Sequence, residues 1–81
     1  MIPFRHLIYT LAVAEHGSVQ AASDYISISQ PALSAAIQKV EENYGLKIFL
    51  RDRPNKLVLT PDGKRFIARA KVLMEGAEEF E

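Results

Sequence analysis

The chain contains no cysteine, which excludes disulfide bonds and thiolate chemistry and fits a reducing compartment. It has only two histidines, His6 and His16, without the clustered partners of a metal site or a catalytic triad. No apolar run approaches the roughly 20 residues of a membrane span, and the N-terminus lacks the pattern of a signal peptide. We therefore expect a cytoplasmic protein that is not an enzyme, binds no metal and does not enter a membrane.

The chain also has no excess of positive or negative charge, because the formal net charge of its 81 residues is zero. The distribution is uneven. Residues 47–71 hold eight Lys or Arg against two Asp, a net +6, whereas residues 72–81 hold four Glu and no base, and residues 1–46 carry −2. Such a basic stretch can bind phosphate whatever the total charge, because the fields of exposed charges are screened within about 8 Å at physiological salt. The alternative is a solvated face with scattered ion pairs.

A chain of this length forms one small domain with a single core and no deep substrate cavity. Its first segment, Pro3 to about Glu15, has apolar residues at helical period and is expected to be a scaffold helix that ends at Gly17. Ser18 is the expected N-cap of a second helix, and Ser27-Ile28-Ser29 forms the following turn.

The third helix is expected to begin at the N-cap Ser29, with Pro31 in its first turn. At 100° per residue, one face is apolar and is predicted to be buried; its residues are Leu33, Ala36, Ile37, Val40 and Tyr44. The opposite face is short, polar and nearly uncharged. Its side chains suit the base edges of a DNA major groove, and the predicted base contacts are Gln30, Pro31, Ser34, Ala35 and Gln38.

After Gly45 the period changes to two, which predicts a small β-hairpin. Leu46, Ile48 and Leu50 alternate with Lys47, Phe49 and Arg51, a basic turn covers residues 53–56, and residues 57–59 form the second strand. Beside a recognition helix, such a wing places cations on phosphates or in a minor groove. The alternative is an ordinary hairpin with charges that protect its edges. The predicted backbone and wing contacts are Ser18, Gln20, Ser29, Lys39, Arg51, Arg53 and Lys56.

Thr60-Pro61-Asp62 is a strong helix start, and the helix is expected to run to the chain end. Apolar residues recur at steps of four and three, as in the seam of a coiled coil. Since the small core cannot cover about 20 residues, we expect the distal half to pair with a second copy. The predicted dimer interface consists of Phe66, Ile67, Ala70, Leu73, Met74, Ala77 and Phe80.

Together these residues resemble the N-terminal DNA-binding domain of LysR-type transcriptional regulators, over essentially the whole chain. The residues that carry the resemblance are Ala12-Val13-Ala14-Glu15, Gly17-Ser18, Ser29-Gln30-Pro31-Ala32-Leu33-Ser34, Ile37, Glu41, Gly45-Leu46, Phe49, Arg51, Leu59-Thr60 and Gly63. The resemblance implies a mainly α fold: a winged helix-turn-helix in residues 1–60, with the helix-turn-helix at 18–42 and the two-stranded wing at 46–59, followed by a dimerising linker helix at 61–81. It also implies a C-terminal sensor domain for a small-molecule inducer, which these 81 residues do not contain.

The expected function is that of a bacterial, nucleoid-associated transcription regulator that binds a pseudo-palindromic operator as a homodimer. The DNA-binding domain itself is expected to need no cofactor. RNA polymerase is a candidate partner, and the full-length protein could form either a dimer or a tetramer. The sequence departs from the family pattern at Ala21 and Ala35, where arginine is frequent, and at Ser23, where alanine is common. The alternative is a protein-binding winged helix or a dimerisation module without DNA readout, for which apolar anchors on the third helix would be expected.

Overall fold

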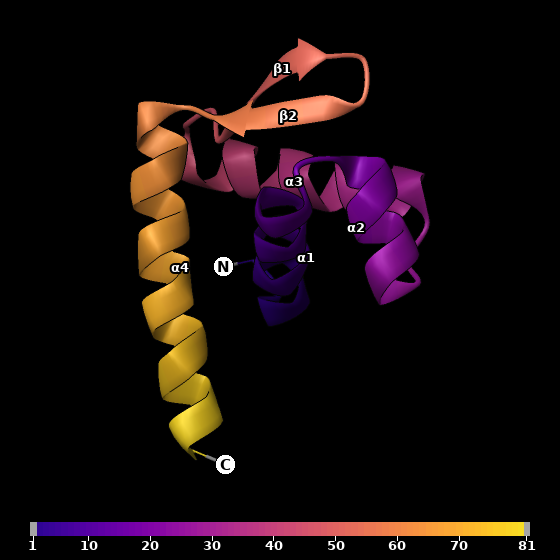
Figure 1. The fold of residues 1–81 in the computed structure, drawn as a ribbon. Coiled ribbons are helices and arrows are strands. Elements are labelled where there is room, and N and C mark those ends of the chain that lie inside the picture. Colours follow the sequence, from indigo (N-terminus) through magenta and orange to yellow (C-terminus); the bar gives the residue numbers. More distant parts are fainter. Residues whose placement is uncertain (1, 81) are drawn as a thin grey trace.

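Four helices and a two-stranded antiparallel sheet make up the computed structural model, which describes residues 2–80 (Figure 1). The elements, in chain order, are α1 (Phe4–His16), α2 (Val19–Ile26), α3 (Gln30–Tyr44), β1 (Phe49–Arg53), β2 (Lys56–Leu59) and α4 (Pro61–Phe80). α1, α2 and α3 pack together, the β1–β2 hairpin lies above them, and α4 runs down one side and beyond the body. The predicted mainly α winged helix-turn-helix with a long terminal helix is confirmed.

The predicted helix boundaries of the first two helices rest on local caps, and the structure confirms both caps. Gly17 adopts the left-handed conformation, with φ 78°, and its amide donates to the Val13 carbonyl at 2.9 Å. The Ser18 hydroxyl accepts a hydrogen bond from the Ala21 amide at 3.0 Å. Because Gly17 ends α1 and Ser18 starts α2, the chain turns sharply between the two helices.

The turn between α2 and α3 is stabilised by Ser23, one of the departures from the family pattern. Its hydroxyl donates to the Ile28 carbonyl, and its own carbonyl accepts from the Ile28 amide at 3.3 Å. Ser27 takes a left-handed conformation, with φ 58°. A serine at position 23 therefore adds a side-chain bond across the turn that alanine cannot make.

The largest fully buried side chains come from three parts of the chain: Val13 of α1, Leu33 and Val40 of α3, and Ile48 before the wing. Thr10 is also fully buried, and its hydroxyl donates to the His6 carbonyl at 2.8 Å. The apolar face of α3 is buried as predicted, with one exception. Tyr44 is half exposed and packs its ring against Phe66 of α4, with 5.2 Å between the centroids.

The predicted alternation of faces along the first strand is wrong. The alternation placed Ile48 and Leu50 on one face, but Ile48 and Phe49 are both buried while Leu50 is 50% exposed. The cause is a tertiary contact: the Glu41 carboxylate accepts from the amides of Ile48 at 2.7 Å and Phe49 at 3.4 Å. These bonds hold Ile48 and the first residue of β1 against α3. A register shift between Arg51 and Arg53 further interrupts the alternation.

Backbone hydrogen bonds fasten the wing to the rest of the domain. The Leu57 amide donates to the Gly17 carbonyl at 2.8 Å, and the Thr60 amide donates to the Ile48 carbonyl at 3.0 Å. The Thr60 hydroxyl accepts from the Gly63 amide at 2.8 Å, as an N-cap does, and donates to the Lys47 carbonyl at 2.5 Å. The wing is thereby held in a defined position relative to α1 and α4.

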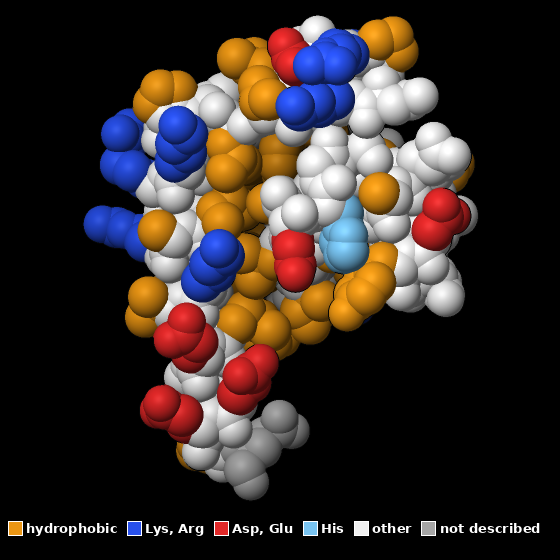
Figure 2. Space-filling view, in the orientation of Figure 1, with side chains coloured by type: hydrophobic (Ala, Val, Ile, Leu, Met, Phe, Trp, Pro, Cys, Tyr) orange, Lys and Arg blue, Asp and Glu red, His pale blue; other side chains and the backbone are white. Residues whose placement is uncertain are grey.

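The long helix α4 has two unlike halves. Near its start, Ile67 and Ala70 are 5% and 6% exposed, and Ile67 belongs to the core of its own domain. Toward its end, Leu73 and Phe80 are 52% and 93% exposed. Figure 2 shows Lys and Arg side chains over the upper part of α4 and acidic side chains over the lower part. Ile67 and Ala70 were predicted to face a second copy; their own domain already covers them, because the helix packs on α1 and β2 there.

Candidate nucleic-acid interface

The outer face of α3 is exposed along its whole length. Pro31, Ser34, Ala35 and Gln38 all lie in solvent, on the side of the helix opposite Leu33 and its buried neighbours. Ser29 caps the helix, since its hydroxyl accepts from the Ala32 amide at 3.3 Å. The predicted base-contacting side chains therefore form one continuous strip of short polar and small apolar groups on a helix held from behind.

The wing tip and the first turns of α2 and α3 surround a small depression of about 160 Å³. It gathers six of the residues predicted to contact DNA, from the starts of α2 and α3 and from both strands of the wing: Ser18, Gln20, Gln30, Ser34, Arg51 and Lys56. Hydroxyl, amide and cationic groups of this kind are the usual donors to phosphate oxygens. The depression therefore gathers donors suited to phosphate oxygens next to the outer face of α3.

The wing cations differ in their surroundings. The Arg51 guanidinium donates to the Pro54 carbonyl at 2.7 Å, which folds this side chain along the turn. Arg53 lies 3.7 Å from the Asp52 carboxylate, in an exposed ion pair of the kind that contributes little. Lys56 takes part in none of the ion pairs found among residues 2–80. Lys56 and Arg51 line the depression, whereas Arg53 does not.

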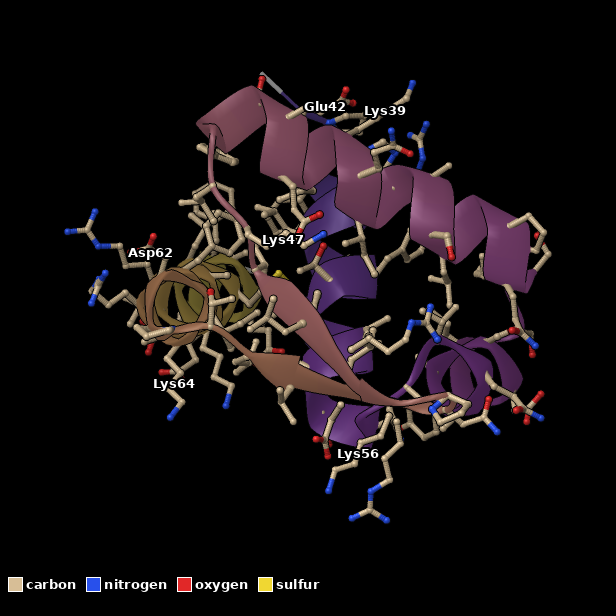
Figure 3. The ribbon with its side chains drawn as sticks, turned by 90° about the horizontal axis from the view of Figure 1, so that it is seen from above. Lys39, Glu42, Lys47, Lys56, Asp62 and Lys64 are labelled. Carbon is tan, nitrogen blue, oxygen red and sulfur yellow. The ribbon has the colours of Figure 1, made fainter. Side chains whose placement is uncertain are left out.

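Lys39 does not join the wing residues. It lines a different, open depression with Arg5, His6, Glu42 and Asn43, between α3 and the start of α1. Seen from above, Lys39 and Glu42 lie beside α3 at one edge of the molecule, and Lys56 lies beside the hairpin at the opposite edge (Figure 3). Of the seven predicted backbone contacts, Ser18, Gln20, Arg51 and Lys56 line the wing depression, Lys39 lies on the opposite flank of α3, and Ser29 and Arg53 line neither depression.

Pro54 and Asn55 line the wing depression but were absent from the predicted site, as was Arg5. The sequence predicts only a turn at Pro54-Asn55, although the position between two basic residues is a usable signal. Arg5 lies on a helix that the sequence predicts to be scaffold, and no local pattern connects it with Lys39. Among residues 2–80, no cluster of acidic and histidine side chains could hold a metal ion, and no helix has the length and apolarity to cross a membrane.

Comparison with known proteins gives consistent matches. Residues 4–64 match the family described as "Bacterial regulatory helix-turn-helix protein, lysR family". A relative in Haemophilus influenzae, "HTH-type transcriptional regulator MetR", is 41% identical over 73 residues, which is 90% of this chain and 23% of that protein. The "Uncharacterized HTH-type transcriptional regulator YvbU" of Bacillus subtilis is 36% identical over 69 residues, 85% of this chain and 24% of that protein. The chain spans about a quarter of the length of these relatives.

Solved structures match over nearly the whole chain. The "BenM_DBD/benA site 1 DNA Complex" superposes with a TM-score of 0.90 at 34% identity and covers 98% of this chain and 88% of the other. The "CbnR_DBD-DNA complex" has a TM-score of 0.90 at 32% identity, with 96% and 88% covered. Both titles describe a DNA-binding domain on DNA, and the curated relatives are named as regulators of transcription.

Proposed function

Because this chain belongs to the LysR family and forms the DNA-binding domain of a LysR-type transcriptional regulator, we propose that it reads a pseudo-palindromic operator as a dimer. The outer face of α3 enters the major groove, and the wing contacts the backbone or the adjacent minor groove. We propose the same division as predicted from the sequence, with the winged helix-turn-helix in residues 1–60 and the dimerising helix in residues 61–81.

The observation that carries this proposal is the depression between the wing tip and the starts of α2 and α3. A phosphate held there by Lys56, Gln20 and the Ser18 hydroxyl would bring the adjoining groove onto the exposed side chains of Gln30 and Ser34. Glutamine can pair with the N6 and N7 edge of adenine, and serine can donate to or accept from any base edge. Phosphate contacts would set the register, and α3 would read the sequence.

Ala21 and Ala35 determine which base composition we expect in the operator. Ala35 is exposed on the reading face of α3, and its methyl group can contact only apolar parts of a base, such as the methyl of thymine. Arginine with guanine is the commonest specific pairing, and the chain lacks it at this position. We therefore expect operators richer in A·T pairs and weaker binding than in relatives that carry arginine at both positions.

Dimerisation is proposed to use the exposed part of the α4 seam. With Ile67 and Ala70 already covered, the available apolar residues are Phe66, Leu73, Met74, Ala77 and Phe80. The seam continues into a depression of about 500 Å³ that is lined by Leu7, Tyr44 and Leu46, so a partner helix would find a wide apolar surface.

Charge sets the direction of that pairing. Residues 61–71 carry four Lys or Arg against Asp62, and residues 72–80 carry three Glu. Parallel helices would place like charges together. Antiparallel helices place the acidic half of each over the basic half of its partner, which favours the antiparallel dimer. The same orientation would place the two copies of α3 at opposite ends of the pair, as an inverted repeat requires.

The remainder of the regulator is proposed from the length of the relatives. A sensor domain that binds a small-molecule inducer would account for the roughly three quarters of their length outside this match. One solved structure, of which this chain covers 24%, is titled "Corynebacterium glutamicum OxyR C206S mutant, H2O2-bound". RNA polymerase would be a partner of the assembled regulator on DNA in the bacterial cytoplasm.

Selection of bound duplexes from a random pool tests the proposed function directly. An interrupted inverted repeat is expected, with the half-sites separated by whole turns of DNA. On the selected duplex, Gln30→Ala should cost about 1 to 3 kcal/mol and relax the preference at one position of each half-site. Gln20→Ala is the matched control, because a backbone contact should weaken binding to all sequences equally.

Two results would count against base reading. The first is failure to recover any preferred sequence. The second is an equal loss of affinity for selected and random duplexes in the Gln30→Ala variant, which would make Gln30 another backbone contact.

A further inference from the structure

The flank of α3 that faces away from the wing carries a second cluster of cations. At 100° per residue, Lys39 and Asn43 project roughly 140° to 180° around the helix from Ser34 and Glu41. Ser34 lines the wing depression and Glu41 holds the start of the wing, so this rotation places Lys39 on the opposite flank. Figure 3 shows the same separation between Lys39 and Lys56.

Arg5 joins Lys39 there from the first turn of α1. Both side chains are exposed and line one open depression with His6, Asn43 and Glu42. Neither cation takes part in the ion pairs found among residues 2–80. The pKa of His6 is lowered, first by burial and then by the positive charges of Arg5 and Lys39, which is consistent with a positive potential on this flank.

The dimensions of duplex DNA give this flank a function. A helix with its side chains is about 10 to 12 Å across, and the major groove is about 12 Å wide. A helix that fills the groove therefore has a phosphate strand on each side. The wing depression can hold only the strand on its own flank, and the other strand would run past Arg5 and Lys39.

We propose that Arg5 and Lys39 form a second phosphate clamp, which binds the strand across the major groove from the strand held by the wing. This inference rests on the proposed function, and it adds a residue of α1 to the interface. Asn43 is placed to donate a further hydrogen bond to the same phosphate or its neighbour. With both strands held, α3 is fixed against rocking about its own axis, so its base-reading face keeps one orientation in the groove.

Glu42 limits the strength of the clamp. Its carboxylate is exposed in the same depression and repels an approaching phosphate. Removing this charge with Glu42→Gln should strengthen binding, whereas removing a cation should weaken it. Partial unfolding would weaken binding in every variant, so it cannot explain a gain in affinity in one variant and a loss in its neighbour.

The test is a salt titration of binding to a duplex selected from random sequences by the unmodified protein. Each lost phosphate contact should reduce the slope of log affinity against log salt by about 0.9. We expect this reduction for Arg5→Ala and for Lys39→Ala, and about twice as much for the double variant. Lys64→Ala is the charge-matched control, because Lys64 lies on α4 away from both flanks of α3 (Figure 3). In a Lys64→Ala variant that sedimentation shows to be dimeric, the slope should not change.

Ethylation interference on the same duplex identifies the strand. Phosphates that interfere in the unmodified protein but not in Arg5→Ala/Lys39→Ala should lie across the major groove from those lost in Lys56→Ala. An unchanged slope in the double variant, or loss of the same phosphates as in Lys56→Ala, would overturn the clamp while leaving the proposed function intact. If the unmodified protein selects no duplex at all, the proposed function fails first. Thermal unfolding of each variant confirms that the exposed substitutions leave the fold unchanged.

Discussion

Replacement of Gly63 by alanine should destabilise the domain, although the same change in an ordinary helix is stabilising. Gly63 lies in the first turn of α4, where the helix crosses the segment before the wing. A Cβ atom at this position would lie 2.1 Å from the Ile48 carbonyl oxygen and 2.9 Å from its carbon. Contacts with backbone atoms below 3.0 Å are essentially never found, so the segment and the helix must separate by about 1 Å.

That movement has a calculable effect on stability. The Ile48 carbonyl accepts from the Thr60 amide at 3.0 Å, and the Ile48 side chain is fully buried, so the displaced segment cannot adjust without disturbing both. Overpacking costs about 1 to 3 kcal/mol, and a weakened hydrogen bond about 1 kcal/mol more. Alanine returns up to about 1 kcal/mol in helix propensity. The net loss is about 2 kcal/mol, which lowers the midpoint of thermal unfolding by about 8 to 16 °C.

Gly76 of the same helix supplies the matched control, because a Cβ atom there would meet nothing within 4 Å. Gly76→Ala should raise the free energy of unfolding by about 0.5 to 1 kcal/mol. Both variants are unfolded by urea and by heat at one fixed protein concentration, since dimerisation makes the midpoint depend on concentration. Equal midpoints for Gly63→Ala and Gly76→Ala would refute the close approach of α4 to Ile48.

Three further changes test other contacts. Glu41→Gln should lower the free energy of unfolding by about 1 kcal/mol in urea, because a neutral acceptor replaces the carboxylate at the Ile48 amide; an unaltered midpoint would contradict this role. His6→Asn should reduce the loss of folding stability that occurs as pH falls below about 6.5. Because the pKa of His6 is lowered in the folded state, the unfolded chain binds the proton first, and stability falls with pH in the unmodified protein. An identical pH profile of the two proteins would argue against this role of His6. Leu73→Glu should give a monomer in sedimentation, whereas Val72→Glu, exposed but off the seam, should stay dimeric; a dimeric Leu73→Glu would place the interface elsewhere.

The helix boundaries were predictable because each depends on residues close in sequence. Gly17 ends α1 through a bond four residues back, and Ser18, Ser29 and Thr60 cap helices through amides three residues ahead. The outer face of α3 was predictable for the same reason, since helical period alone separates Ser34 from Leu33.

Features that depend on contacts between distant residues were not predictable. The alternation around Leu50 failed because Glu41, on another element, fixes the two preceding amides. The seam of α4 included Ile67 because periodicity identifies an apolar stripe without identifying what covers it; the α1 side of the domain covers its first turns. Arg5 was not predicted because Lys39, which lines the same depression, is contributed by a helix more than 30 residues later in the chain.

The zero net charge of the chain is compatible with DNA binding because the charges belong to separate surfaces. In an antiparallel dimer, the three Glu of residues 72–80 would lie over the cations of the partner's residues 61–71, so much of the α4 charge would be neutralised within the dimer. The cations that remain without such partners are on the wing and on the Arg5–Lys39 flank, on either side of the nearly uncharged reading face. Dimerisation would therefore leave a positive field at the two flanks of each α3, where the phosphate strands of a duplex pass. The face between them reads base edges by hydrogen bonds and apolar contacts, for which side chains of low charge are well suited.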